Sequence, residues 1–112
     1  MDELYRRRCT PCTGKTPVVP RGEAVEKLRD LAGWTLSEDG TAIRAEYAFK
    51  NFHETMGFAN AVAWMANQED HHPDLELSYA RCAVRYSTHA VGGLSENDFI
   101  CAAKVDRLFS GG

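Results

Sequence analysis

A strict alternation of apolar and polar residues over positions 43–50 constrains the fold of this chain most strongly. The segment reads IRAEYAFK, so an extended chain would place apolar side chains on one face and charged side chains on the other. Asp39 and Gly40 come shortly before it, and Asp-Gly is a favoured dipeptide in hairpin turns. We therefore expect a brief strand at 34–36, a turn, and a half-buried antiparallel strand at 43–50.

A second pair of strands and three helices are expected along the rest of the chain. Apolar residues alternate again over 75–79 and 82–88. Helical spacing predicts helices over 21–33, where Val25, Leu28 and Leu31 share one face, over 51–69, and from Ser95 to about Phe109. The order α-β-β-α-β-β-α contains hairpins rather than crossovers. This predicts an α+β fold, a two-layer, four-stranded antiparallel sheet with three helices on one face.

The helix predicted at 51–69 has more apolar surface than one contact with a sheet requires. Its first apolar stripe comprises Phe52, Met56, Ala59, Ala63 and Ala66, and beside it stand Phe58, Val62 and Met65. We expect the first stripe to cover the sheet and the second face to meet another copy of the chain. Open sheet edges favour the same outcome, a homo-dimer or tetramer.

The first 20 residues differ in character from the remainder. Residues 1–20 hold three of the four prolines and no periodic pattern, which predicts an extended N-terminal arm before a single domain at 21–112. The arm carries Cys9 and Cys12 as a CxxC pair. Such a pair is open to three interpretations: zinc ligands completed by another subunit, a redox pair, or inert thiols in a flexible arm.

Charge and hydropathy exclude several classes of protein. A net charge of −3 and a pI near 5.8 argue against a general nucleic-acid binder. No apolar run reaches the length of a membrane span, and no hydrophobic segment follows the N-terminal charges as in a secretory signal. We expect a cytoplasmic protein with reduced cysteines.

Three histidines are expected to converge. His71 and His72 stand side by side between the long helix and the third strand, and His89 follows the fourth strand. A hairpin around residues 80–81 would bring all three to one end of the sheet, with Asp98 nearby. Histidine exchanges protons near neutral pH, so two such rings facing a small substrate could act as acid and base. A structural or solvated role for each ring remains the alternative.

A metal centre at these histidines is not expected. Imidazole is a common zinc ligand, but adjacent residues of an extended chain point to opposite sides. His71 and His72 would therefore not share one ion easily, and the chain has no HxH or HxxxH spacing.

The string NQEDHHPDLELSY, followed by STH and then by Asp98, resembles the active-site pattern of pterin-4a-carbinolamine dehydratases. The resemblance extends to GW at 33–34, FKNF at 49–52, GF at 57–58 and GLSENDF at 93–99, and it spans most of 22–109. It implies loss of water from 4a-hydroxytetrahydropterin to give quinonoid dihydropterin, with no metal or organic cofactor. It also implies a pterin substrate and an aromatic amino-acid hydroxylase as a possible partner.

The resemblance assigns roles to particular residues of this chain. It makes His71 and His89 the acid/base pair, with His72 as a third catalytic residue. The implied substrate-binding set is Asp70, His71, His72, Pro73, Ser87, Thr88, His89, Ala90 and Asp98.

Two positions leave alternatives open. The family pattern has an acidic residue four positions before His71, where this chain has Asn67, which can form hydrogen bonds but carries no charge. A non-catalytic interaction protein on the same fold, an assembly or regulatory partner of a larger enzyme or transcription factor, is therefore the second hypothesis. Asp98 is open to two interpretations, as a site residue or as the cap of the helix that begins after Ser95.

Overall fold

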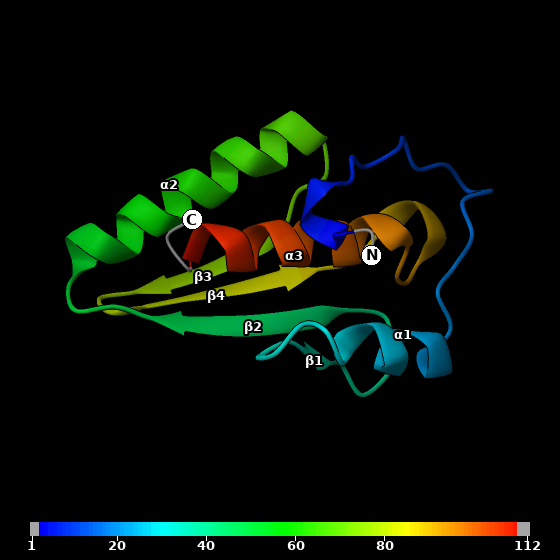
Figure 1. Ribbon diagram of the computed structural model, residues 1–112, viewed down its shortest axis with the longest axis horizontal. Coiled ribbons are helices and arrows are strands. Elements are labelled where there is room, and N and C mark those ends of the chain that lie inside the picture. Colours follow the sequence, from blue (N-terminus) through cyan, green and yellow to red (C-terminus); the bar gives the residue numbers. More distant parts are fainter. Residues whose placement is uncertain (1–2, 110–112) are drawn as a thin grey trace.

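The computed structural model describes residues 3–109 and contains a four-stranded antiparallel sheet covered by helices on one face (Figure 1). The elements are η1 Leu4–Arg6, α1 Arg21–Leu28, β1 Thr35–Leu36, β2 Ile43–Ala48, α2 Phe52–Glu69, β3 Asp74–Ser78, β4 Arg81–Tyr86, η2 His89–Val91 and α3 Glu96–Phe109. The strands lie in the order β1-β2-β4-β3. The predicted α+β fold and its element order are confirmed.

The alternating segment forms β2 as predicted, with every second residue buried against the helices. Ile43 and Ala45 lie in the core, whereas Arg44 faces solvent. β2 pairs with the central strand β4, which places Ile43 opposite Tyr86. In the preceding turn Gly40 has a positive φ of 74°, a conformation that a side chain disfavours.

The hairpin of β3 and β4 brings the two ends of the candidate site together. Asp74 pairs with Arg85, and the strands turn at residues 79–80. By this antiparallel register, residues 71–73 before β3 lie beside residues 86–88 at the end of β4. The predicted convergence therefore follows directly from the hairpin.

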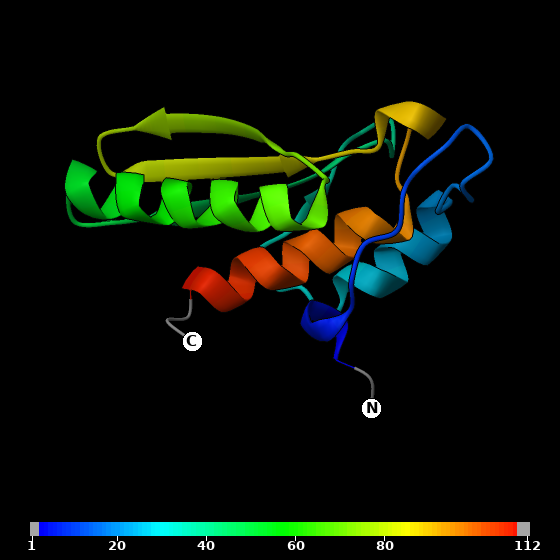
Figure 2. The same cartoon turned by 90° about the horizontal axis from the view of Figure 1, so that it is seen from above.

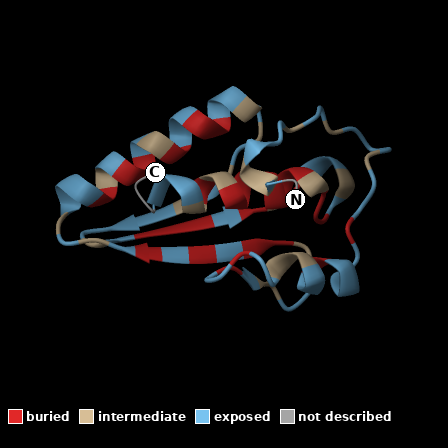
Figure 3. Ribbon diagram, viewed as in Figure 1, coloured by how far each residue is buried: buried red, intermediate tan, exposed pale blue. Residues whose placement is uncertain are grey.

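The buried face of α2 differs from the predicted stripe. Its buried residues are Thr55, Phe58, Ala59, Val62, Met65 and Ala66. Phe52 is 48% exposed and Ala63 also faces solvent, so the predicted sheet-facing stripe is wrong at these positions (Figure 3). Ala59 and Ala66 of that stripe are buried as predicted, so the buried face of α2 is rotated from the predicted stripe towards Phe58, Val62 and Met65.

This result removes one argument for an oligomer. Phe58, Val62 and Met65 are buried within the single chain and are not available to a partner. The homo-oligomer itself stays a prediction, which now depends on other surfaces. Exposed apolar side chains remain on α2 and near β3, among them Trp64 and Tyr79.

The first and last helices pack together at one end of the molecule. α1 is shorter than predicted, because the chain turns after Leu28 and Gly33 adopts a φ of 91°. Ala24 is its buried residue, and Val25, expected on the inner face, is 48% exposed. The ammonium of Lys27 lies 2.8 Å from the Glu96 carboxylate and so connects α1 to the start of α3.

The N-terminal arm is mostly extended, as expected, but it lies across α3 rather than free in solvent (Figure 2). The Lys104 ammonium donates to the carbonyl of Tyr5 at 2.8 Å. Arg8 forms an ion pair of 3.0 Å with Glu69, whose side chain is only 5% exposed. These contacts attach the arm to the C-terminal end of α2 and to α3.

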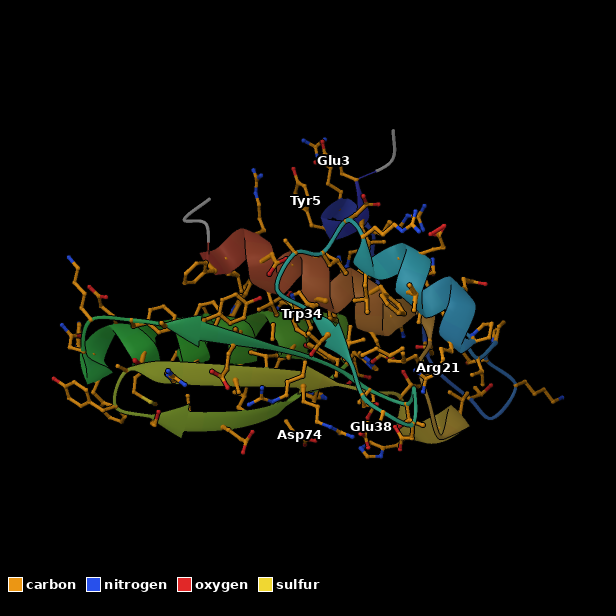
Figure 4. All side chains as sticks on the ribbon, turned by 90° about the horizontal axis from the view of Figure 1, so that it is seen from below. Glu3, Tyr5, Arg21, Trp34, Glu38 and Asp74 are labelled. Carbon is orange, nitrogen blue, oxygen red and sulfur yellow. The ribbon has the colours of Figure 1, made fainter. Side chains whose placement is uncertain are left out.

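Side chains extend on both sides of these layers (Figure 4). Tyr5 lies on the side of α3 away from the sheet, and Asp74 lies on β3 at the opposite side of the molecule. Trp34 is buried and donates from its indole nitrogen to the Asp106 carboxylate at 3.0 Å, which ties the chain before β1 to α3. Among residues 3–109, no helix is long and apolar enough to cross a membrane.

Candidate active site

A histidine–aspartate pair lies at the centre of the candidate site. Nε2 of His71, just after α2, is 2.6 Å from Oδ1 of Asp98 in the first turn of α3. The His71 side chain is 10% exposed and the Asp98 side chain is fully buried. A buried carboxylate needs hydrogen-bond donors, and the imidazole N–H supplies one of them.

The second oxygen of the Asp98 carboxylate has two further donors. The Thr88 hydroxyl donates to Oδ2 at 2.7 Å, and the backbone N–H of Ser95 donates to it at 2.9 Å. The hydroxyls of Thr88 and Ser95 are also 2.7 Å apart. Asp98 therefore caps α3, as one interpretation predicted, and also bonds to His71, while its role as a site residue stays a prediction.

The chain around His71 fixes the position of its ring. Asp70 ends α2 in a left-handed conformation, and the His71 N–H then donates to the carbonyl of Ala66 at 3.1 Å. The ring stacks on Tyr86 at 5.3 Å between centroids, and the Tyr86 hydroxyl donates to the His71 carbonyl at 3.2 Å. These contacts fix both the ring and the backbone of His71. Because Nε2 is bonded to Asp98, Nδ1 is the ring nitrogen that can exchange a proton with a substrate.

The surroundings of His71 also shift its basicity. Burial alone would lower the pKa of the imidazole, but the hydrogen bond and negative charge of Asp98 outweigh burial and raise that pKa above its usual value. Electrostatic interactions with Cys101 and Asp70 act in the same direction. The ring therefore keeps its proton to higher pH than a free histidine does.

The other two histidines have more exposed positions. Nε2 of His72 lies 3.0 Å from the amide oxygen of Asn67, one turn back on α2. His89 directly follows Thr88 and opens η2, where its side chain is exposed. Because Thr88 contacts Asp98, His89 stands at the same end of the sheet as His71.

The remaining predicted site residues are neighbours in sequence of the histidines and of Thr88. Pro73 and Ser87 are half-buried beside the ends of β3 and β4, and Asp70 and Ala90 are exposed next to them. The structure thus brings the predicted residues to one sheet end, although direct bonds join only His71, Thr88 and Asp98 within that set.

Sequence reasoning missed three residues that shape the site. Tyr86 supports the His71 ring, Ser95 bonds to Thr88, and Cys101 lies one helical turn after Asp98. A signal for two of them, Tyr86 and Cys101, was available. Tyr86 shares the inward face of its strand, and positions 98 and 101 share one face of a helix.

Two hollows in the surface lie away from the candidate site. One of about 750 Å³ is bordered by η1, α1 and α3, including Tyr5 and Lys27. Another of about 370 Å³ lies beside Trp64 and Lys104. Neither is lined by His71, His72 or His89, so the candidate site is not part of these two hollows.

Comparison with known proteins gives a consistent result. The family model described as Pterin 4 alpha carbinolamine dehydratase matches residues 18–108. The chain belongs to the pterin-4a-carbinolamine dehydratase family. The match includes the whole sheet, α2, all of α3 except its last residue, and every histidine of the candidate site.

Individual members of the pterin-4a-carbinolamine dehydratase family are similar over nearly the full length. A relative from Nitrosospira multiformis is 51% identical over 97% of this chain and 95% of its own. One from Nitrosomonas eutropha is 52% identical over 95% of this chain and 93% of its own. The names of both relatives refer to pterin-4-alpha-carbinolamine dehydratase.

Solved structures share the fold. A transcriptional coactivator/pterin dehydratase from Brucella melitensis superposes with a TM-score of 0.79 at 32% identity, covering 83% of this chain and 99% of its own. A pterin dehydratase-like protein identified as a RuBisCO assembly factor in the alpha-carboxysome gives 0.59 at 19% identity, covering 68% of this chain and 88% of its own. The second likeness concerns the fold alone.

Proposed function

We propose that this family member dehydrates 4a-hydroxytetrahydropterin to quinonoid dihydropterin and water. The observation that carries the proposal is the 2.6 Å contact between His71 and the buried Asp98. It supplies a proton donor of raised pKa beside two further imidazoles, at the sheet end where the family pattern lies. The substrate class itself comes from family membership.

His71 is assigned the role of general acid. Asp98 stabilises the imidazolium, so His71 can carry a proton on Nδ1 while Nε2–H stays bonded to the carboxylate. Transfer of that proton to the 4a-hydroxyl lets the C4a–O bond break with water as the leaving group. A neutral hydroxyl would otherwise have to leave as hydroxide.

His89 is assigned the role of general base. The second half of the reaction removes the proton from N5 of the pterin, and the N5 lone pair then forms the new double bond to C4a. His89 is exposed at the same sheet end as His71, which supports this assignment. Proton gain by His89 and proton loss by His71 balance, so the pair needs only exchange with water to reset.

His72 is assigned to substrate binding and to support of catalysis. Its contact with Asn67 holds the ring at the rim of the site, and Pro73 stiffens the chain that follows. Asp70, Ser87, Thr88 and Ala90 would border the pterin, partly through backbone groups. Asp98 acts through His71 and Thr88, because it is fully buried.

The proposal is tested by measuring dehydration directly. A hydroxylase that releases the 4a-carbinolamine would generate the substrate, and the absorbance of the quinonoid product would be followed with and without the purified protein. An increase in the dehydration rate over the uncatalysed rate supports the proposal. A rate equal to the spontaneous reaction at micromolar protein rules it out.

The cellular setting in this proposal is tetrahydropterin recycling in the cytoplasm, beside an aromatic amino-acid hydroxylase. Such a hydroxylase would release the carbinolamine that the site consumes. We also propose that the protein acts there as a homo-dimer or tetramer.

One observation favours the second hypothesis, a non-catalytic partner of a larger enzyme or transcription factor. Asn67 contacts His72 where the family pattern has an acidic side chain, so His72 lacks a charged neighbour there. The dehydration assay separates the two functions, because a binding protein would leave the spontaneous rate unchanged.

A further inference from the structure

Two thiols from opposite ends of the chain meet beside the candidate site. Sγ of Cys9 in the arm lies 3.5 Å from Sγ of Cys101 in α3. Cys101 is fully buried, whereas Cys9 is partly exposed, so the pair is accessible from one side only. The two residues are 92 positions apart in sequence.

Hydrogen bonds on both sides of Cys9 hold it against α3. Its own N–H donates to Glu69 at 2.8 Å. The next residue, Thr10, exchanges two hydrogen bonds with the Asn97 side chain, at 3.1 and 2.6 Å. The close approach of the sulfurs is therefore built into the packing of the arm and does not rest on a single contact.

Cys12 faces a different set of atoms. Its sulfur accepts from the Asn97 amide at 3.0 Å and lies 3.8 Å from the Ser95 hydroxyl. Of the three interpretations of the CxxC spacing, the redox interpretation would pair Cys9 with Cys12, and the fold does not favour that pairing. The thiol beside Cys9 comes instead from α3.

The electrostatics of the two thiols suit thiol oxidation. The hydrogen bond from Cys9 lowers the pKa of Cys101, although burial opposes this, and the hydrogen bond with Tyr86 and the charge of His71 lower it further. The hydrogen bond with Cys101 raises the pKa of Cys9. Cys101 is thus the thiol of the pair whose pKa is lowered, and a thiolate is the reactive form of cysteine.

We propose that Cys9 and Cys101 are a peroxide-responsive pair that forms an intramolecular disulfide. One thiolate attacks an oxygen of hydrogen peroxide, the O–O bond breaks, and the released hydroxide takes a proton to become water. The other sulfur then attacks the resulting sulfenic acid, the S–O bond breaks, and a second water leaves. Two thiols lose two electrons and two protons, and one peroxide becomes two waters.

The bond would tie the arm covalently to the helix that carries Asp98. Cys101 is one turn beyond Asp98 on α3, and Tyr86 contacts both His71 and the Cys101 thiol. Oxidation would therefore join the arm to the wall of the site without using any of its proposed acid/base groups. This inference does not depend on the dehydration activity.

Mass spectrometry of peroxide-treated protein tests the pairing. Trypsin yields the peptide 9–15, which holds Cys9 and Cys12, and the peptide 86–104, which holds Cys101. After treatment with a few equivalents of hydrogen peroxide and alkylation of free thiols, the two peptides should run as one species that a reductant separates. The linked species should persist in Cys12→Ser and disappear in Cys9→Ser.

The controls use residues that leave the core intact. Cys9 is partly exposed, so Cys9→Ser should fold, and its melting temperature without peroxide reports this directly. A disulfide within peptide 9–15, a link that depends on Cys12, or oxidation of Cys9 to sulfinic acid with Cys101 still free would each overturn the proposal. So would recovery of all four thiols unmodified.

Discussion

Oδ1 of Asp98 lies 2.6 Å from the His71 ring, and Oδ2 of the same carboxylate accepts from the backbone N–H of Ser95 at 2.9 Å. One buried carboxylate thus orients the proposed acid and starts the last helix. Oδ1 bonds to the His71 ring and Oδ2 bonds to the start of α3, so substitutions of Asp98 can be assayed separately for activity and for stability.

His71→Ala and His89→Ala should each reduce the dehydration rate by about 10²-fold or more, because each removes a proposed proton-transfer group. The measurement is kcat/KM on the 4a-carbinolamine. His53→Ala is the matched control, since His53 is exposed in the first turn of α2, away from the sheet end. Wild-type rates in either site variant would contradict the assigned roles.

Asp98→Asn should move the alkaline limb of the pH–rate profile to lower pH. Asp98 raises the pKa of His71, so the wild-type acid stays protonated above the ordinary value of 6.5, and the variant should lose its acid earlier as pH rises. The raised pKa of His71 also makes the stability of the fold depend on pH. A raised folded pKa stabilises the fold below the unfolded value, and that contribution is lost as pH rises through the folded pKa.

The free energy of unfolding, measured across a range of pH, tests whether Asp98 raises the pKa of His71. Denaturation by urea between pH 6 and 9 should show wild type losing stability relative to Asp98→Asn as pH rises through the folded pKa of His71. Parallel curves for the two proteins would contradict the coupling of His71 to Asp98.

Asp98→Ala should destabilise the fold by about 2–4 kcal/mol, because the Thr88 hydroxyl and the Ser95 N–H would lose their buried acceptor. Asp74→Ala is the control. Asp74 is an exposed partner of Arg85 on β3, and an exposed ion pair contributes at most about 1 kcal/mol. Equal free energies of unfolding for the two variants would show that the buried network adds nothing to stability.

Asn67→Glu should raise kcat/KM, because a carboxylate at this position would give His72 the charged neighbour of the family pattern. Gln68→Glu adds the same charge at the next residue of α2, which is also exposed, and should have little effect. An unchanged or lower kcat/KM in Asn67→Glu would show that the site is adapted to the amide.

The protein should sediment as at least a dimer at micromolar concentration. The outer edge of β3 has no neighbouring strand in the described sheet, and Leu77 and Tyr79 expose 43% and 66% of their surfaces near it. Phe52 stacks on Tyr79 at 6.4 Å between ring centroids and extends this apolar surface. An interface there should exceed about 1,000 Å².

A charge on this edge tests where the partner binds. Leu77→Lys should weaken association at least about tenfold, since a lysine on a strand edge opposes pairing. Val25→Lys, at a similarly exposed apolar position on α1, should leave the mass unchanged. A single-chain mass for the wild type at all concentrations would rule out the oligomer.

Local patterns in the sequence account for most of the fold. Alternation identified β2, because this strand buries every second residue and the period of a strand is two residues. It also identified the central strand β4, although Ala83 between Cys82 and Val84 is buried there as well. The buried face of α2 could not be assigned in this way. Both of its stripes are apolar at helical spacing, and only the space over the sheet decides that Phe58 and Val62 point inward.

The site was predictable where it depended on the hairpin and not where it depended on packing between distant elements. The register of β3 and β4 brings His71 towards Thr88, which a turn near residue 80 implies. The contact of Cys9 with Cys101 has no local signal, because it arises from the path of the arm across α3. The arm's path is in turn fixed by polar contacts such as Arg8 with Glu69.

That path also sets an order of events during biosynthesis. The carbonyl of Tyr5 is bonded to Lys104, a residue 99 positions later, so this part of the arm emerges before its partner and binds it only after α3 has been made. Contacts of such long sequence separation are slow to form. A nascent chain paused before α3 would expose Tyr5 and Cys9 to the solvent, and both would become protected when synthesis reaches the last helix.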